Sequence, residues 1–443
     1  MNNSLLSISP LSGRYRQKVI ELEKHTSEYA LIKTRIEIEV KYLLALSKIK
    51  VVNLSSSEKK KLSNAVKNFN LTEADKIKKI EERTKHDVKA VEIYLREFLS
   101  RENAEMIHFG LTSYDINDIA FRLMLKNASL NIIIPHLEKI DNELLSLSRK
   151  YKAIPMLART HGQPAVSTTL GKEFAVFASR LNSQLKTLNK IKLTGKLNGA
   201  VGNYNALAFI FPEIDWIKFS KDFVKSFNLE PNLITTQIDP YEDIIEYFQT
   251  IQRLNGVLLD LNQDIWRYIS DGWLIQKSEE GQVGSSTMPQ KINPIDFENS
   301  EGNINLGNGL IEVFSRELPV SRLQRDLSNS TILRNIGSVL GYSLLAYKSC
   351  LNGLSKIEID KIKITEELNK DWSILSEAIQ VVFRREKIGD SYLKVVEMTK
   401  GKHFGEKEWK NLVMSFPISK ENRDKLLALT PLTYLGLAKE LVK

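Results

Sequence analysis

The segment of residues 281–299, GQVGSSTMPQKINPIDFEN, has the residue types of a catalytic loop. Ser285 and Ser286 offer adjacent hydroxyls, and Lys291 and Asn293 follow with a fixed cation and an amide. Prolines in the segment stop helices on both sides. A linker would need neither the lysine nor the asparagine, and the segment lacks the Gly-Lys-Ser/Thr order of a phosphate-binding P-loop. We therefore interpret it as a functional loop.

A second polar segment, residues 157–174 (LARTHGQPAVSTTLGKEF), carries His161 between Thr160 and Gly162. This histidine does not fall on an apolar stripe, so packing in a core explains it poorly. Imidazole changes its charge near neutral pH. Among the six histidines, His161 and His86 are the best candidates for proton transfer.

Residues 107–118, IHFGLTSYDIND, form a third polar segment. Thr112 and Ser113 precede Asp115 and an apolar run, which is typical of a helix start. A helix N-terminus with hydroxyls is also suited to bind a carboxylate. Both interpretations stay open on the residues alone.

The fourth polar segment, residues 83–95 (RTKHDVKAVEIYL), places His86 beside Asp87. Spacing of three puts Arg83, His86 and Lys89 on one face of a predicted helix. That face either binds an anion or is an ordinary solvated surface.

Long helices are predicted to position these segments. No proline lies between Pro10 and Pro135 or between Pro319 and Pro417, and proline-free stretches suit helices. Apolar residues recur at steps of three and four over 133–147, 174–188 and 244–265, as in helices packed side by side. We expect an all-α fold with a central long-helix bundle.

Three domains are predicted along the chain of 443 residues. An N-terminal helical domain spans 1–106. The central long-helix bundle, with the functional loop, spans 107–354. A C-terminal helical domain spans 355–443.

The composition is ordinary for a soluble globular protein. The formal charge is +9, but lysines alternate with acids, so most are expected on solvated helix faces rather than on a nucleic-acid surface. The basic surplus also suits a substrate with several negative charges. Cys350 is the single cysteine, and the chain shows neither a secretory leader pattern nor a membrane-spanning apolar run. We expect a cytoplasmic protein without membrane or nucleic-acid partners.

The order GSSTMPQKINP at 284–294 closely resembles the Gly-Ser-Ser-x-Met-Pro-x-Lys-x-Asn-Pro motif of the fumarase/aspartase superfamily. The resemblance covers nearly the whole chain. Within the superfamily, six segments resemble the bacterial type of adenylosuccinate lyase: ISPLSGRYR, KHDVKAVE, ARTHGQPA, TTQIDPYEDI, KINPIDFENSEGN and SRLQRDLSNSTILRN.

The resemblance implies a three-domain fold whose central bundle forms the core of a homotetramer, with each active site shared between subunits. It implies β-elimination of fumarate from adenylosuccinate, giving AMP, and from SAICAR, giving AICAR. It also implies that the enzyme uses neither an organic cofactor nor a metal.

The resemblance also implies roles for individual residues. Ser285 would be the general base and His161 the general acid. Groups expected to hold the succinyl carboxylates are Thr112, Ser113, Gln237, Lys291 and Asn293. Groups expected to hold the ribotide phosphate are Arg14, Tyr15, Ser330 and Arg334. Other expected substrate-binding residues are His86, Asp87, Met288 and Arg325.

Several alternatives stay open. Ser286 is the next candidate for the base, and His86 is a candidate to share the acid role. Argininosuccinate lyase and fumarase act on substrates without phosphate, which leaves the pair Ser330 and Arg334 without a purpose. A non-enzymatic scaffold and an RNA-binding helical protein are the alternatives outside this chemistry.

Overall fold

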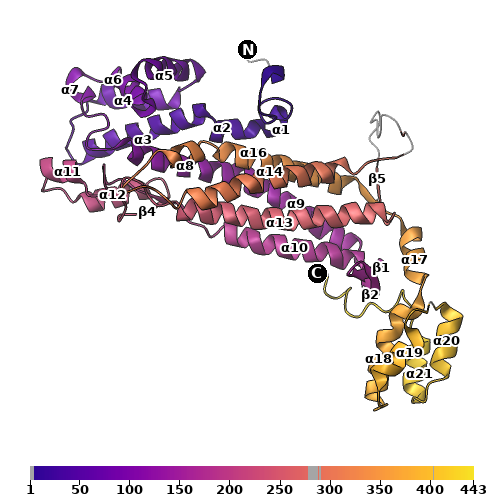
Figure 1. The fold of residues 1–443 in the computed structure, drawn as a ribbon. Helices are drawn as coiled ribbons and strands as arrows, with labels where there is room; N and C mark the ends of the chain where they lie inside the picture. Colours follow the sequence, from indigo (N-terminus) through magenta and orange to yellow (C-terminus); the bar gives the residue numbers. More distant parts are fainter. Residues whose placement is uncertain (1–3, 278–287, 289–290, 403) are drawn as a thin grey trace. The chain divides into compact units, whose positions relative to one another are not determined.

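The computed structural model describes residues 4–277, 288, 291–402 and 404–443, and it is predominantly helical (Figure 1). The chain divides into two compact units. Unit 1 contains residues 1–137, 184–256 and 302–348, and unit 2 contains residues 138–183, 257–301 and 349–443. The all-α prediction is confirmed, whereas the division at residues 107 and 355 stays a prediction.

Unit 1 consists of short and medium helices and one small parallel strand pair. Its helices are α1 (Arg16–Val19), α2 (Glu23–Thr26), α3 (Glu28–Lys48), α4 (Ser56–Lys67), α5 (Leu71–Thr84), α6 (Asp87–Arg96), α7 (Arg101–Ala104), α8 (Ser113–Ala128), α11 (Asn205–Ile210), α12 (Trp216–Lys225) and α15 (Ser328–Leu333). Strand β3 (Thr194–Gly195) pairs in parallel with β4 (Glu230–Pro231).

Unit 2 contains two antiparallel strand pairs and the C-terminal helices. Strand β1 (Pro155–Thr160) pairs with β2 (Gln163–Thr169), and β5 (Leu274–Gln276) pairs with β6 (Ile357–Ile359). The helices are α17 (Lys361–Asn369), α18 (Ser376–Arg385), α19 (Ser391–Thr399), α20 (Glu406–Met414) and α21 (Lys420–Leu427). Five long helices have residues in both units: α9 (Ile134–Lys150), α10 (Leu170–Leu188), α13 (Glu242–Ser270), α14 (Ile295–Glu317) and α16 (Ile336–Lys356).

The longest predicted stripe is confirmed as the buried seam of α13. Its residues are at most 1% exposed: Ile244, Phe248, Ile251, Leu254, Leu258, Leu261 and Ile265. In unit 1, Phe248 packs edge-on against Phe314 of α14, with ring centroids 5.0 Å apart. In unit 2, Asn262 Nδ2 donates to Ser300 Oγ at 2.9 Å. Burial of each large apolar side chain stabilises the fold by about 1.5–3 kcal/mol, so this seam fixes α13 against α14.

The helix predicted across residues 83–95 is wrong, because the chain breaks between α5 and α6. Lys85 adopts a left-handed conformation with φ of 55° and ends α5. His86 then begins α6 as its N-cap, and its Nδ1 accepts a hydrogen bond from the N–H of Lys89 at 3.2 Å. Arg83, His86 and Lys89 therefore do not share one helix face.

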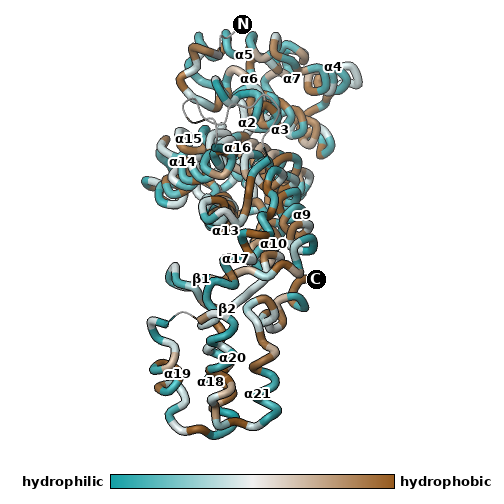
Figure 2. The backbone as a smooth tube through the Cα atoms, turned by 90° about the vertical axis from the view of Figure 1, so that its right-hand side faces the viewer, coloured by the Kyte–Doolittle hydropathy of each residue, from teal (hydrophilic) through white to brown (hydrophobic). Residues whose placement is uncertain are grey.

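The C-terminal helices of unit 2 surround their own apolar core. Polar and apolar turns alternate along α18, α20 and α21 (Figure 2). Trp409, Phe383 and Phe416 lie in this core together with Leu375 and Ile379. The rings of Phe383 and Phe416 meet edge-on, with centroids 4.9 Å apart. Edge-on aromatic pairs of this kind add to the stabilisation from apolar burial.

A buried ionic cluster joins α8, β3 and the start of α13 in unit 1. Arg122 Nε and one terminal nitrogen donate to the carboxylate of Asp243 at 2.8 and 2.9 Å. The same guanidinium bonds to Asp118 and lies 3.3 Å from Asp239. Thr194 Oγ1 donates to Asp239 at 2.6 Å, which attaches β3 to the cluster. All four charged side chains are buried.

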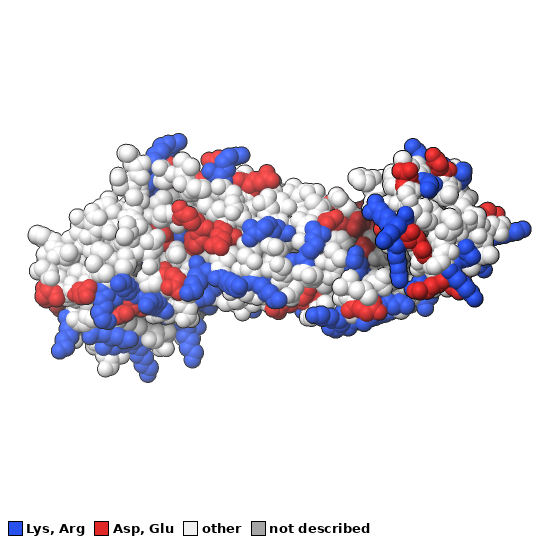
Figure 3. Space-filling model, turned by 90° about the horizontal axis from the view of Figure 1, so that it is seen from below, with Lys and Arg blue, Asp and Glu red and all other residues white. Residues whose placement is uncertain are grey.

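Positive and negative side chains are mixed on the surface. On the face drawn in Figure 3, lysines and arginines lie among aspartates and glutamates. Among the described residues, none of the helices combines the length and the apolar character that a membrane span requires.

Replacing Arg122 by Met is expected to destabilise the protein by about 3–5 kcal/mol, because three buried carboxylates lose their cation. Urea denaturation followed by circular dichroism at fixed protein concentration measures the change. Lys218→Met is the control, since Lys218 forms an exposed ion pair with Asp222 and its loss is expected to leave the midpoint in place. Equal midpoints for the two variants would contradict a stabilising role of the cluster.

Candidate active site

A polar cavity of about 550 Å³ lies within unit 1. Its lining brings together eight of the predicted site residues: His86, Asp87, Thr112, Ser113, Gln237, Arg325, Ser330 and Arg334. These residues come from four segments that are far apart in the sequence. The remaining lining residues are Arg35, Glu81, Lys85, Asn117, Phe121, Leu327 and Thr331.

One wall of the cavity is the N-terminus of α8. Thr112 is the N-cap and Ser113 the first helical residue, which confirms the predicted helix start. The N–H of Thr112 donates to the Asp115 carboxylate at 2.9 Å. The dipole of α8 and two hydroxyls at its N-terminus favour a negatively charged group, so this wall is suited to a carboxylate.

Gln237 and Arg325 form a second, connected wall. Arg325 donates to Gln237 Oε1 at 3.0 Å and to Ser330 Oγ at 3.4 Å. Its guanidinium also lies over the ring of Tyr114, 4.6 Å from the centroid. Because the Arg325 side chain is held at its nitrogens and against a ring, its charge has a defined position beside the amide.

A third wall contains the carboxylate of Asp87 between two guanidiniums. Asp87 Oδ2 accepts from Arg35 at 2.7 Å and from Arg334 at 2.8 Å. Burial raises the pKa of Asp87, but Arg35 and Arg334 outweigh it and hold the pKa below its ordinary value. Arg334 also donates to Glu28 at 3.1 Å. Ser330 lies on α15 and Arg334 at its C-cap, and both line this cavity.

His86 stands at the edge of the cavity with its side chain 51% exposed. Its Nδ1 accepts the hydrogen bond that caps α6. A neutral His86 therefore carries its proton on Nε2, which leaves Nε2–H as the donor that can meet a substrate.

His161 lies in unit 2, at the tip of the hairpin of β1 and β2. Thr160 pairs with Gln163, so His161 and Gly162 form a two-residue turn with φ of 52° and 74°. Such turns need positive φ at both positions, which glycine provides readily. His161 is exposed at this tip, as predicted for a histidine outside a core.

None of the other predicted site residues that the structure describes lines the cavity. Ser285 lies outside the described residues. Met288, Lys291 and Asn293 belong to unit 2, where Met288 is 45% exposed and Lys291 is also exposed. Arg14 and Tyr15 belong to unit 1, at the start of α1, with the guanidinium 5.9 Å from the ring centroid. Their assigned roles stay predictions.

Sequence reasoning missed two buried charged residues of α3, Arg35 and Glu39. Arg35 is 1% exposed and holds Asp87 and Asn117 Oδ1, the latter at 2.8 Å. Glu39 Oε1 lies 2.6 Å from Nδ1 of His108, which belongs to the segment that carries Thr112. Arg35 and Glu39 fall among the apolar positions of α3, and charges at core positions were the signal that could have revealed them.

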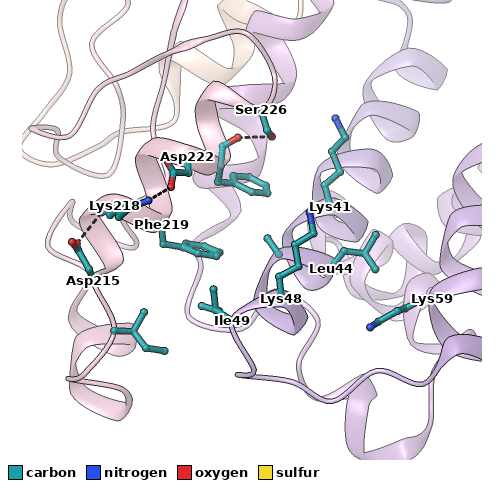
Figure 4. A pocket seen from close by; sticks show the side chains of 13 residues that line it. Lys41, Leu44, Lys48, Ile49, Lys59, Asp215, Lys218, Phe219, Asp222 and Ser226 are labelled. Carbon is teal, nitrogen blue, oxygen red and sulfur yellow. Dashed lines mark hydrogen bonds and ion pairs between the residues drawn. The ribbon is translucent and has the colours of Figure 1, made fainter.

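A larger cavity of about 710 Å³ lies elsewhere in unit 1, between α3 and α12 (Figure 4). Leu44, Ile49 and Phe219 form much of its wall. Lys218 donates to Asp222 at 2.6 Å, and Asp215 caps α12, so both acids are engaged. The lining of this larger cavity contains none of the predicted site residues and offers no acid–base pair for catalysis. Among the described residues, no cluster of His, Cys, Asp and Glu is placed to hold a metal ion.

Two family models match this chain. Residues 13–306 match the family model described as Lyase, and residues 321–435 match the model described as Adenylosuccinate lyase C-terminal. A fumarate lyase from Mesorhizobium sp. BNC1 has the same fold, with a TM-score of 0.79, 19% identity and 96% of each chain covered. A beta-carboxy-cis,cis-muconate cycloisomerase from Acinetobacter calcoaceticus sp. ADP1 gives a TM-score of 0.76 at 18% identity, covering 97% of this chain and 98% of that one. The model that covers residues 13–306, more than half of the chain, places the chain in the Lyase family.

Relatives with higher sequence identity indicate which kind of lyase the chain resembles. Adenylosuccinate lyase of Haemophilus influenzae is 44% identical over 450 residues, covering 100% of this chain and 99% of that protein. The enzyme of Escherichia coli K12 is 43% identical over 445 residues, covering 98% of both chains. The chain therefore belongs to the adenylosuccinate lyase family.

His108→Gln is expected to destabilise the protein more at pH 6 than at pH 9. Burial lowers the pKa of His108, but Glu39, Glu92 and Asp115 outweigh it and raise the pKa above 6.5. The charged form thus stabilises the fold fully below pH 6.5, and this contribution is lost as the pH rises through the folded pKa. We expect a loss of about 1–3 kcal/mol at pH 6, measured by urea denaturation.

His25→Gln provides the matched control for this prediction. Burial and Lys24 lower the pKa of His25, so its substitution is expected to show the opposite pH trend. A His108→Gln loss that is equal at both pH values would contradict the ionic role of His108.

Proposed function

We propose that this chain catalyses β-elimination of fumarate from adenylosuccinate, giving AMP, and from SAICAR, giving AICAR, in purine nucleotide biosynthesis. The observation that carries this function is 43–44% identity to adenylosuccinate lyases along at least 98% of the chain. The cavity supports it, because these substrates carry both carboxylates and a phosphate. The α8 N-terminus suits the former, and the guanidinium of Arg334 suits the latter.

The reaction requires a base and an acid on opposite sides of one carbon–carbon bond. The base removes a proton from the succinyl Cβ, and the electron pair left behind forms the double bond of fumarate. The Cα–N bond breaks in the same overall change, and the acid protonates the departing nitrogen. We assign Ser285 as base and His161 as acid, and His161 on an exposed hairpin tip is accessible to a substrate.

The developing negative charge spreads into the carboxylate next to Cβ. Thr112, Ser113 and Gln237 hold the succinyl carboxylates from the cavity, and Lys291 and Asn293 hold them from the loop. Donors placed where charge develops give the largest catalytic contribution. Serine is a very weak base, so the positive charge of Lys291 also activates Ser285.

The phosphate and nucleotide occupy the arginine-rich part of the site. Ser330 and Arg334 hold the phosphate together with Arg14 and Tyr15. Arg325, His86 and Met288 contact the rest of the substrate. Asp87 orients the guanidiniums of Arg35 and Arg334, which donate to it. A guanidinium binds two phosphate oxygens at once, which gives direction as well as charge.

The active enzyme is a cytoplasmic homotetramer whose sites are shared between subunits. The cavity lining of unit 1 includes neither His161 nor Arg14, so other segments complete the site. Large apolar side chains beside the cavity residues are exposed in the single chain: Ile234 (92%), Leu323 (89%) and Leu327 (69%). Exposed apolar groups next to a site are typical of subunit interfaces. Cys350 is a buried thiol, which suits a reducing compartment.

Purified protein is expected to convert adenylosuccinate to AMP. The loss of adenylosuccinate is measured by its ultraviolet absorbance. Ser285→Ala and His161→Gln are each expected to lower kcat by at least about 10²-fold, because proton transfer is lost, while the tetramer remains in size-exclusion chromatography. Turnover of argininosuccinate or malate without turnover of adenylosuccinate would overturn the function. Full activity of Ser285→Ala together with loss in Ser286→Ala would move the base to Ser286.

Arg334→Met is expected to raise KM for adenylosuccinate by about 10–100-fold, since charge-assisted bonds to the phosphate are lost. Inhibition by AMP should weaken to a similar degree, and steady-state kinetics measure both. Arg322→Met is the control, because Arg322 is 84% exposed and is not part of the cavity lining. An unchanged KM in Arg334→Met would remove Arg334 from the phosphate site.

A further inference from the structure

We propose that Lys196 is a positioning residue for the carboxylate-binding part of the site. It acts by holding Thr112 and Gln237 in place, without touching the substrate. The proposal rests on the proposed function, because it concerns how the same cavity receives the succinyl group. None of the sequence motifs contains Lys196, so the structure alone points to it.

The ammonium group of Lys196 is completely buried and fully bonded. Its Nζ lies 2.8 Å from Asp115 Oδ1, and both side chains are 0% exposed. It also donates to the carbonyls of Gln237 at 2.9 Å and Gly199 at 3.1 Å. An ammonium has three protons, so these three acceptors use all of them.

The Asp115 carboxylate extends this contact to the start of α8. Asp115 Oδ2 accepts the N–H of Thr112 at 2.9 Å. Its two oxygens also accept the N–H of Asn198 at 3.1 Å and that of Gly199 at 3.2 Å. A single buried ion pair therefore connects the backbones of Thr112 and Gln237, the two cavity segments expected to hold carboxylates.

The loop after Lys196 also orients the side chain of Gln237. The Gln237 amide nitrogen donates to the carbonyl of Ala200 at 3.0 Å, and its Oε1 accepts from Arg325. Gly202 lies against the backbone before Gln237, where an added Cβ would come within 2.1 Å of the carbonyl oxygen of Thr235. Both the backbone and the amide of Gln237 are thus fixed by the segment that Lys196 begins.

Stability alone does not account for a lysine at this position. Burying an ammonium and a carboxylate costs about as much as their attraction returns, and apolar replacements are often as stable. The contacts of Lys196 lead instead to two segments of one cavity. A cation with only a structural role would not need to contact both of these cavity segments.

The test compares Lys196→Met with the double variant Lys196→Met/Asp115→Asn. The double variant removes both charges, so folding is restored relative to the single variant while Gln237 and Gly199 still lose their donor. Calorimetry measures the binding of fumarate and of AMP to each protein. We expect the double variant to bind fumarate about tenfold or more weakly, with AMP binding within about twofold of wild type. Its kcat/KM for adenylosuccinate should fall at least as far as its fumarate affinity.

One further variant, with its own control, keeps the test decisive if the Lys196 variants do not fold. Gly202→Ala is expected to displace residues 235–237 with the ion pair intact, and so to weaken fumarate binding in the same way. Gly256→Ala is its control, because an added Cβ there meets no atom within 4 Å. Lys192→Met is the control for Lys196, since Lys192 is 74% exposed and pairs only with Glu230 among the described contacts.

The outcomes separate this proposal from the proposed function. Wild-type protein that binds no fumarate and does not cleave adenylosuccinate would overturn the function itself. Wild-type binding that persists unchanged in the double variant and in Gly202→Ala would overturn the positioning role. Equal weakening of fumarate and AMP would also overturn it, because it would indicate a general loss of structure.

Discussion

Buried charge behind the N-terminus of α8 is the constraint on which the cavity of unit 1 depends. Lys196 and Arg122 each lie fully buried among carboxylates of α8, including Asp115 and Asp118. Isolated charges of this kind would be very costly away from water, so each of these buried carboxylates lies against Arg122 or Lys196. The helix start, the loop after β3 and the start of α13 are therefore fixed relative to one another within this unit. The cavity walls that these segments form are therefore held in fixed positions as well.

The cavity that results has two chemical characters. Neutral donors, Thr112, Ser113 and Gln237, occupy the part beside the α8 N-terminus, with Arg325 bonded to Gln237. The guanidiniums of Arg35 and Arg334 flank Asp87 in the other part. The lining contains four cationic side chains, Arg35, Lys85, Arg325 and Arg334, against two carboxylates, Glu81 and Asp87. Such an excess attracts a polyanion. The difference between the two parts then orients it, because a dianionic phosphate gains more from guanidiniums than a carboxylate gains.

Local patterns predicted the helices well, and they predicted few of the contacts between them. The stripe of α13 and the start of α8 follow from spacing and capping. The helix break before His86 does not follow from the sequence. Lys85 adopts a left-handed conformation there, which is common for glycine or asparagine and is not expected of lysine. Pairing of Asp115 with Lys196 is a contact between distant residues, and each looks like an ordinary surface charge in sequence. The site residues themselves were reached through a family motif, and residues 284–287, 289 and 290 of that motif lie outside the described residues.

The arrangement around Asp87 explains how Arg334 can change partners at low cost. Arg334 bonds to Asp87 and to Glu28, so a phosphate must compete with two carboxylates for its guanidinium. If Asp87 depended on Arg334 alone, the departure of Arg334 would leave a half-buried carboxylate without a cation. Arg35 prevents this, because it is buried and stays 2.7 Å from the same oxygen. Arg334 is 45% exposed and long, so it can turn toward a phosphate while Asp87 keeps its charge neutralised.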